Sequence, residues 1–281
     1  MMYDAAIIGG GVIGGFCARE LTRYNLSVVI LEAADDVAAG ASRANSGIVH
    51  AGFDAAEGTL KARFNVLGNR MMPGICKELG VGYKNNGSLV VAFGKEQENT
   101  LRELRSRGEK NGVEGLEILS GEQARAKEPH LSERVTAALF APTGGIVCPF
   151  TLNIAAVGNA MDNGAALLTG FRVSAVVKEK DCFALTSEDG REIRARFAVN
   201  AAGAGSERVA KLFGDDSFRI GFRKGEYMLL DSAAGGFARH TVFAVPTAAG
   251  KGVLVSPTTD GNLLVGPTSV EEKDFDLSVR P

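Results

Sequence analysis

The first fifty residues show an ordered succession of apolar runs, a glycine cluster and a polar end point. Residues 3–8 form a short apolar run of the kind that fills a buried parallel strand. Over residues 12–24 the apolar side chains recur at helical spacing, and residues 27–31 form a second apolar run that Glu32 ends. The pattern predicts a strand, a glycine turn, a helix and a second strand followed by an acid.

The glycine turn has the spacing that lets a backbone approach a phosphate group. It reads Gly9, Gly10, Gly11, Val12, Ile13 and Gly14. Gly9 allows the tight turn after the strand, Gly11 lets the backbone come close to a pyrophosphate, and Gly14 lets the helix pack against the strand. The helix N-terminus adds N–H groups and a partial positive charge. We expect a dinucleotide to contact this turn; the alternative is a glycine turn without a ligand.

The acid that ends the second strand fits the same interpretation. Glu32 lies 18 residues after Gly14, where a carboxylate can accept hydrogen bonds from ribose hydroxyls. A carboxylate at this point would repel a 2′-phosphate, which argues against NADP.

A loop of small residues follows Glu32, where a nicotinamide-binding domain usually continues with another crossover helix. Ser42, Asn45 and Ser46 can donate hydrogen bonds to phosphate or ribityl oxygens, and Gly47 permits close approach to a flat ring. The sequence therefore predicts that a long cofactor has its second part in contact with Ser42, Arg43, Asn45, Ser46 and Gly47.

Five motifs spread along the chain carry a family resemblance. They are SGIVHAG at 46–52, GTLKA at 58–62, RKGEY at 223–227, PTTDGN at 257–262 and LVGPT at 264–268. On these motifs the chain resembles the D-amino-acid-oxidase-type flavoprotein superfamily. Within it, the chain is similar to the FAD-dependent glycerol-3-phosphate dehydrogenases, in particular the anaerobic-type catalytic subunit, and to the L-2-hydroxyglutarate oxidase and dehydrogenase group. The resemblance implies FAD as the cofactor.

The resemblance also implies an α/β fold in which a glutathione-reductase-like FAD-binding Rossmann domain is interleaved with a β-rich α+β substrate domain. The expected FAD-binding parts are residues 1–80 and 148–215, and the expected substrate-domain parts are residues 81–147 and 216–281. Related chains continue further and supply a C-terminal segment that closes over the flavin. We expect this segment to be absent here, which leaves open a flavin-binding fragment without turnover of its own.

The remaining pattern places further elements along the chain. Residues 95–111 are charged with Leu101 and Leu104 on one side, which predicts a surface helix. Ser120 and Gln123 make a capping box for a short helix. Another helix is expected from Thr151 to about residue 163. Strands are expected over 87–93 and 167–177, with hairpin turns at 189–190 and 260–261. Residues 218–281 are expected to be mostly β structure.

Two further cofactor contacts are implied by the resemblance alone. Backbone groups near Val173 would touch the adenine edge, and the segment Ala201, Ala202 and Gly203 would pass close to the cofactor.

Oxidation of a secondary alcohol needs a base for the hydroxyl proton while a hydride moves to flavin N5, and an imidazole has a suitable pKa. Of the three histidines, His50 lies in the loop expected beside the flavin and is the first candidate, with a structural role as the alternative. His240 is the second candidate, and His130 is expected at the surface. An anionic substrate needs fixed positive charge, for which Arg223 and Lys224 are the candidates, the alternatives being a surface ion pair with Glu226 or a domain-packing contact.

Composition narrows the remaining choices. The net charge of −2 gives no field that favours nucleic acid, and no apolar run reaches the roughly 18 residues of a membrane span. Four scattered cysteines without a C-x-x-C pair disfavour a metal site. The absence of a basic leader indicates a cytoplasmic protein, with peripheral membrane contact left open.

The family resemblance implies oxidation of glycerol 3-phosphate, a small anionic substrate, to dihydroxyacetone phosphate. An L-2-hydroxyglutarate (2-hydroxy acid) oxidase or dehydrogenase and an amino-acid or amine oxidase are the alternatives. The sequence has no second G-x-G-x-x-G motif. We therefore expect the electrons to pass to a quinone, to oxygen or to a redox protein.

Overall fold

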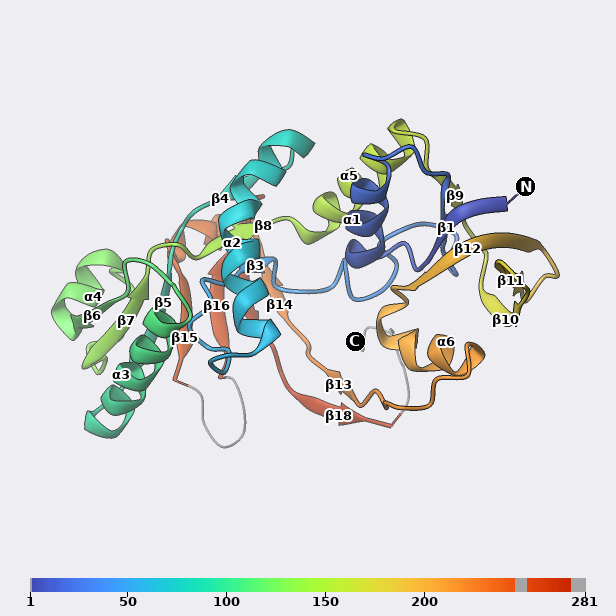
Figure 1. Ribbon diagram of the computed structural model, residues 1–281. Helices are drawn as coiled ribbons and strands as arrows, with labels where there is room; N and C mark the ends of the chain where they lie inside the picture. Colours follow the sequence, from blue (N-terminus) through green and yellow to red (C-terminus); the bar gives the residue numbers. More distant parts are fainter. Residues whose placement is uncertain (1, 246–251, 274–281) are drawn as a thin grey trace. The chain divides into compact units, whose positions relative to one another are not determined.

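The computed structural model describes residues 2–245 and 252–273, and the chain divides into two compact units (Figure 1). Unit 1 comprises residues 1–45, 149–223 and 271–281, and unit 2 comprises residues 46–148 and 224–270. The first change of unit falls at residue 45 and not at the expected residue 80, because Ala51, Phe53 and Val66 pack into the core of unit 2.

Unit 1 is built on a six-stranded sheet with the order β10-β11-β12-β1-β2-β9. Its strands are β1 (Met2–Ile8), β2 (Val28–Leu31), β9 (Ala166–Leu168), β10 (Val173–Lys178), β11 (Phe183–Ser187) and β12 (Glu192–Asn200). The strands β12, β1, β2 and β9 run parallel, whereas β10, β11 and β12 form an antiparallel meander. The hairpin expected at residues 189–190 is confirmed between β11 and β12. The strand expected over 167–177 is two strands, β9 and β10, because the chain turns at Gly170 with φ +60°.

Helices cover both faces of this sheet. They are α1 (Val12–Leu21), α5 (Pro149–Asp162), the 3₁₀ turn η1 (Gly203–Gly205) and α6 (Ser206–Leu212). Ala18 of α1 and Val157 of α5 pack with Ile7 and Ile30 on one face, and Val209 of α6 packs on the other. The helix expected from Thr151 begins two residues earlier, because Pro149 fits the first helical position, where its missing N–H removes no hydrogen bond.

Unit 2 contains a seven-stranded sheet with the order β14-β17-β16-β15-β5-β7-β6, and a three-stranded sheet with the order β3-β8-β4. The strands are β3 (Ile48–Val49), β4 (Tyr83–Lys84), β5 (Ser88–Ala92), β6 (Glu117–Ser120), β7 (Ala137–Ala141), β8 (Gly145–Val147), β14 (Met228–Leu230), β15 (Thr241–Ala244), β16 (Leu254–Pro257) and β17 (Leu263–Gly266). All neighbours in the larger sheet are antiparallel except β15 and β5. The expected hairpin turn at 260–261 is confirmed between β16 and β17.

Two short strands, β13 (Phe222–Lys224) and β18 (Val270–Glu272), pair with each other, and a 3₁₀ helix, η2 (Ser232–Phe237), follows β14. The β structure expected over 218–281 is thus present up to β18. Residues 274–281 lie outside the described residues.

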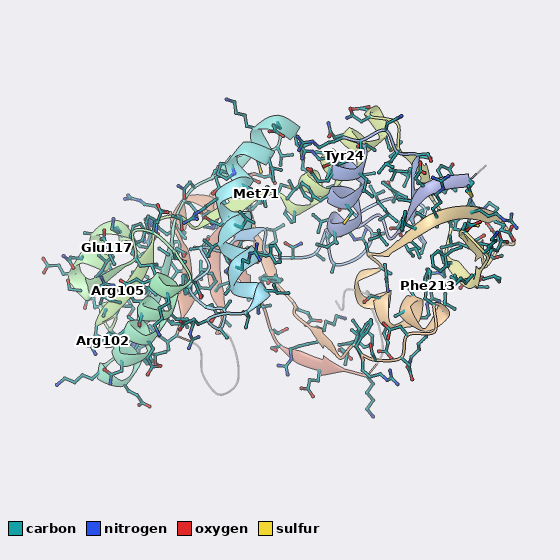
Figure 2. The ribbon with its side chains drawn as sticks, in the orientation of Figure 1. Tyr24, Met71, Arg102, Arg105, Glu117 and Phe213 are labelled. Carbon is teal, nitrogen blue, oxygen red and sulfur yellow. The ribbon has the colours of Figure 1, made fainter. Side chains whose placement is uncertain are left out.

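The helices of unit 2 are α2 (Leu60–Leu79), α3 (Lys95–Lys110) and α4 (Gly121–Lys127). Leu101 and Leu104 of α3 are buried as expected, while Arg102 and Arg105 extend outward (Figure 2). The capping box of α4 is confirmed. Within the described residues, no helix is both long enough and apolar enough to cross a membrane.

The seven-stranded sheet has two distinct faces, because alternate residues of a strand point to opposite sides. Val90 and Ala92 of β5 pack with Leu104 of α3, and Leu89 and Val91 pack on the side of α4.

Candidate functional site

The glycine turn of unit 1 brings three backbone segments closer than side chains would permit. Gly9 has φ +116°, and a Cβ at this residue would lie 2.4 Å from the carbonyl oxygen of Ala201. A Cβ at Gly14 would lie 1.9 Å from the carbonyl oxygen of Gly9. The expected need for glycine at these two positions therefore has a direct steric cause.

The N-terminus of α1 opens toward the same place. Gly11 precedes the helix and has no side chain to cap it, and the N–H of Val12 donates to the hydroxyl oxygen of Ser42 at 2.9 Å. The loop after Glu32 thus supplies a hydroxyl group at the positive end of the helix, where an anion is stabilised.

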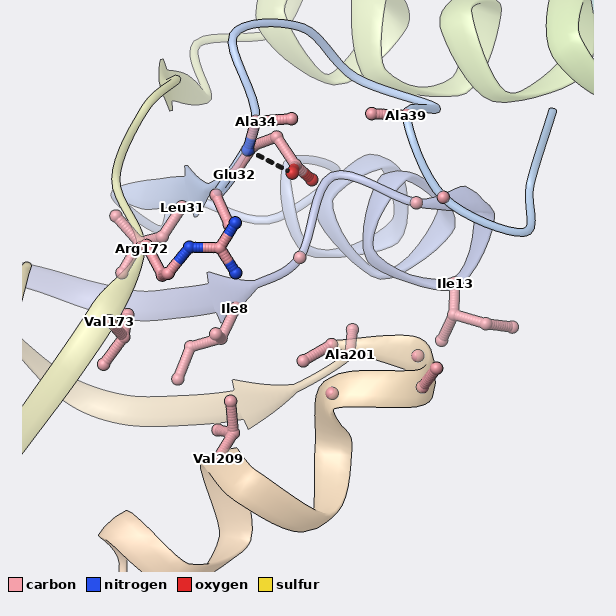
Figure 3. Close-up of a pocket in the computed structure, with 18 of the residues that line it drawn as sticks. Ile8, Ile13, Leu31, Glu32, Ala34, Ala39, Arg172, Val173, Ala201 and Val209 are labelled. Carbon is pink, nitrogen blue, oxygen red and sulfur yellow. Dashed lines mark hydrogen bonds between the residues drawn. The ribbon is translucent and has the colours of Figure 1, made fainter. Parts of the chain in front are cut away.

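Glu32 is held by backbone N–H groups. Its Oε2 accepts from Gly10 N at 2.6 Å and its Oε1 from Ala34 N at 2.8 Å, the bond drawn in Figure 3. Each carboxylate oxygen has a further lone pair, so Glu32 keeps acceptor capacity for ribose hydroxyls.

Asn153 on α5 fixes the turn from behind. It is fully buried, and its Nδ2 donates to the carbonyl oxygen of Gly10 at 3.0 Å. Its Oδ1 has no hydrogen-bond partner among the residues that the structure describes. The sequence analysis did not single out Asn153, because an asparagine inside a helix gives no local signal of a partner 143 residues away.

These elements surround a pocket of about 250 Å³ in unit 1 (Figure 3). The predicted residues that line it are Gly9, Gly11, Val12, Ile13, Glu32, Ser42, Val173, Ala201, Ala202 and Gly203. Gly14 lies at the contact of α1 with the turn, and Arg43, Asn45, Ser46 and Gly47 are not among the lining residues.

Two arginines of the pocket were missed in the sequence. Arg172 and Arg208 both line it, and Figure 3 shows the guanidinium group of Arg172 among the lining side chains. Arg172 lies 3.6 Å and Arg208 3.8 Å from carboxylate oxygens of Glu188. The available signal for Arg172 was its position directly before Val173.

The pocket fits the adenosine diphosphate half of a dinucleotide. Ile8, Leu31 and Val173 give apolar walls for a purine, Glu32 offers acceptors to a ribose, and the start of α1 suits a pyrophosphate. The residues present therefore suit the predicted cofactor on geometric grounds.

In unit 2, His50 directly follows β3 and lies on the α3 side of the seven-stranded sheet. Its ring stacks on Phe243, with the ring centroids 5.8 Å apart and the planes at 27°. Both residues border a small cavity of about 40 Å³ whose other lining residues include Phe53, Val90 and Leu104. The half-buried imidazole therefore has an apolar surface on one side.

His240 lies on the other face of the same sheet. Its ring meets Phe140, which packs on the α4 side, edge-on with centroids 5.7 Å apart. Its Nδ1 lies 3.2 Å from Oε2 of Glu128, and this oxygen also accepts from the backbone N–H groups of Arg239 and His240. The structure therefore separates the two candidate histidines by the thickness of a sheet. His130 is exposed and stacks on Phe237.

The two candidate cations both have acidic neighbours. Arg223 Nη2 lies 2.7 Å from Oε1 of Glu271, and Lys224 Nζ lies 4.0 Å from Oε1 of Glu226. The Lys224 side chain is 14% exposed, whereas that of Arg223 is 54% exposed. The ion pair that was weighed as an alternative is present for Lys224, and Arg223 has a different partner.

No disulfide joins the four cysteines, all of which are described. Burial raises the pKa of the Cys17 and Cys76 thiols. Over residues 2–245 and 252–273, no cluster of three His, Cys, Asp or Glu side chains could hold a metal ion.

Comparison with known families decides the relationship. Residues 4–281 match the model of the family described as DAO, FAD dependent oxidoreductase. The chain belongs to this family. The resemblance deduced from the motifs is thereby confirmed, and so is FAD as the cofactor.

Among curated proteins, the chain is 41% identical over 267 residues to the glycerol 3-phosphate dehydrogenase of Caloramator mitchellensis, covering 95% of this chain and 55% of that protein. It is 30% identical over 285 residues to the mitochondrial L-2-hydroxyglutarate dehydrogenase of Homo sapiens, covering 95% of this chain and 61% of that protein. The chain thus spans little more than half the length of either relative.

Among solved structures, the chain is similar to the L-alpha-glycerophosphate oxidase of Mycoplasma pneumoniae with FAD bound. The TM-score is 0.92 at 30% sequence identity, covering 98% of this chain and 73% of that one. This likeness confirms the predicted α/β fold.

Proposed function

We propose that this chain is the cofactor-binding and substrate-binding part of an FAD-dependent dehydrogenase that oxidises glycerol 3-phosphate to dihydroxyacetone phosphate. The observation that carries the proposal is the 41% identity to a glycerol 3-phosphate dehydrogenase over 95% of this chain. The glycerophosphate oxidase, similar over 98% of the chain, supports the same substrate class.

The reaction removes a hydride from the carbinol carbon and a proton from its hydroxyl group, leaving a ketone. When bound, FAD supplies the acceptor for the hydride. His50 takes the hydroxyl proton on its imidazole, because a neutral histidine is an effective base near neutral pH. Phe243 supports this role, since its stacked ring limits the orientations open to the imidazole.

Arg223 and Lys224 supply the positive charge for the anionic end of the substrate. A guanidinium group can hold a phosphate or carboxylate through two parallel hydrogen bonds, and an ammonium group acts as a point charge. For Arg223 this requires exchanging Glu271, whose side chain is 81% exposed, for the substrate anion. Such an exposed ion pair contributes little to stability, so breaking it to bind the substrate anion costs little free energy.

L-2-hydroxyglutarate is the second candidate substrate, and the 30% identity to the human L-2-hydroxyglutarate dehydrogenase favours it. It too carries a secondary hydroxyl group and negative charge, so the same residues would take the same roles. Oxygen, a quinone or a redox protein would serve as the electron acceptor.

Anaerobic titration of the FAD-loaded protein with each compound tests the proposal. We expect glycerol 3-phosphate to bleach the flavin absorbance, and bleaching by L-2-hydroxyglutarate alone would assign the second substrate instead. If neither compound bleaches a bound flavin, the proposed function is wrong for this chain.

The proposed base has a test of its own. His50→Gln should slow flavin reduction by about 10²- to 10⁴-fold without loss of FAD, because general base catalysis contributes that much. His130→Gln is the matched control, since His130 is exposed and stacks on Phe237. A His50→Gln protein that reduces its flavin at the original rate would remove His50 from the mechanism.

A further inference from the structure

The segment that follows β3 is a loop with a buried backbone. Ala51, Phe53 and Ala55 are 2%, 7% and 5% exposed. A buried loop lacks the regular backbone pairing of a strand or helix, and each carbonyl left without a donor is destabilising. The hydrogen-bond donors for the carbonyl groups of this loop therefore come from other parts of unit 2.

Asn69 on α2 donates to the residue at the start of this loop. Its side chain is 8% exposed, and its Nδ2 lies 3.1 Å from the carbonyl oxygen of His50 and 2.8 Å from that of Thr143. The carbonyl oxygen of Val49 is further away, at 3.5 Å. The two amide protons thus join His50 to the turn between β7 and β8.

Two side chains hold the rest of the loop, one in the last turn of α3 and one on the residue that follows this helix. Asn111 Nδ2 donates to the carbonyl oxygens of Gly52 at 3.1 Å and Ala55 at 2.9 Å. Arg107 Nη1 donates to the carbonyl oxygen of Asp54 at 3.2 Å. Four carbonyl groups between residues 50 and 55 therefore accept from side chains of α2 and α3.

Packing fixes the same loop against α2. Gly52 has φ +113°, and a Cβ there would lie 2.5 Å from Cγ2 of Val66. The backbone of the loop therefore rests directly on the helix that carries Asn69. Neither α2 nor Asn69 is predicted by the apolar pattern of the sequence.

We infer that Asn69 is the positioning residue for His50: its side-chain amide holds the backbone of His50 so that the imidazole keeps one place against Phe243. The inference rests on the proposed function only for its catalytic consequence. Asn111 has a supporting role, since it holds the carbonyl groups two and five residues further along.

The direct test uses the imidazole signals of the protein labelled with ¹³C-histidine, which has three histidines, His50, His130 and His240. His50→Gln assigns the His50 signal. Asn69→Ala should shift or broaden that signal and leave the other two unchanged, because only His50 loses its tether. A His50 signal that keeps its position and width in Asn69→Ala would overturn the inference.

Two further variants protect this test from general effects on folding. Asn99→Ala replaces an exposed asparagine on α3 and should leave all three signals in place. If Asn69→Ala disperses all three signals, Asn69→Leu is used, because leucine keeps the volume of the side chain and removes both donors. The inference then requires a displaced His50 signal with the other two unchanged, and unchanged signals throughout would contradict it.

The catalytic consequence is measured separately. Asn69→Ala should slow flavin reduction by about 100-fold with unchanged affinity for FAD, because a small displacement of a reacting group is that costly. If His50→Gln slows reduction and Asn69→Ala does not, positioning by Asn69 is wrong. If His50→Gln has no effect, the proposed base is wrong, and the histidine signals alone judge Asn69.

Discussion

The pocket of unit 1 and the His50 loop of unit 2 are built from different materials. Around the pocket, backbone groups come together because Gly9 and Gly14 lack a Cβ. Around the loop, side chains from two helices donate to backbone carbonyl groups, Asn69 from α2 and Asn111 from the end of α3. The pocket of unit 1 requires residues without a Cβ, whereas the His50 loop requires side-chain amides that donate hydrogen bonds.

One device is nevertheless common to both regions. Asn153 donates to the carbonyl oxygen of Gly10 in unit 1, and Asn69 donates to that of His50 in unit 2. Both amides are buried and each comes from a helix. An amide can satisfy a buried carbonyl without placing a net charge inside the protein, so it suits a loop whose backbone must stay fixed.

The largest expected effect is at Gly14. Gly14→Ala would place a methyl group 1.9 Å from the carbonyl oxygen of Gly9, so α1 must move away from the turn. We expect a loss of about 3 kcal/mol in the free energy of unfolding, as for severe overpacking. FAD binding, followed by fluorescence titration, should be lost with it.

Gly158→Ala is the matched control for Gly14→Ala. Gly158 lies within α5 of the same unit, and a Cβ added to it would have no atom within 4 Å. The change should stabilise by about 0.5–1 kcal/mol, since alanine favours a helix more than glycine does. Equal behaviour of the two variants would contradict the steric argument.

A smaller effect is expected at Asn153. Asn153→Ala removes the 3.0 Å donor to the carbonyl oxygen of Gly10 and leaves the weaker bond from Ala38 N at 3.4 Å, at a cost of about 0.5–1.5 kcal/mol. The dissociation constant for FAD should rise while the His50 imidazole signal stays in place. Asn69→Ala should do the reverse, so a variant that changes both readouts would show that the two tethers do not act locally.

The sequence predicts these two regions unequally. Gly9, Gly14 and Glu32 were predictable because each requirement is local to one turn or one strand end. The tethers were not, since Asn69 and His50 are 19 residues apart and Asn153 and Gly10 are 143 apart. α2 also escaped prediction, because Pro73 interrupts the helical pattern, although Thr59 and Gly80 mark its two ends.

His240 sharpens the comparison within unit 2. His240→Gln removes the 3.2 Å contact with Glu128 but leaves the two backbone N–H groups on that carboxylate. We expect a loss of about 1 kcal/mol in the free energy of unfolding from urea denaturation. The rate of flavin reduction should be unchanged, because His240 and His50 lie on opposite faces of the sheet. A rate as low as that of His50→Gln would reject this separation of roles.

The smallest expected effect concerns acid. A lowered pKa is found for the carboxyl groups of six residues of unit 1, Asp4, Glu179, Asp189, Glu207, Asp215 and Asp216. The hydrogen bond from Arg194 is the main cause at Glu179, and that from Lys211 is the main cause at Glu207. Asp189, Asp215 and Asp216 are exposed and the other three are partly exposed, so solvent screening keeps each contribution small.

A lowered pKa in the folded state means that the unfolded state binds protons more readily as the pH falls. The contribution of these groups is complete above their ordinary pKa values of 3.8 for Asp and 4.5 for Glu, and it is lost as the pH falls through the lower folded values. Hydrogen exchange of peptides from both units, corrected for intrinsic rates, should therefore show unit 1 losing protection first below about pH 4.5. Arg194→Gln should reduce this acid sensitivity and slightly lower the stability at neutral pH, because Glu179 then loses its main partner. If unit 2 opens first, side-chain tethers, rather than surface carboxylates, limit the stability of the chain in acid.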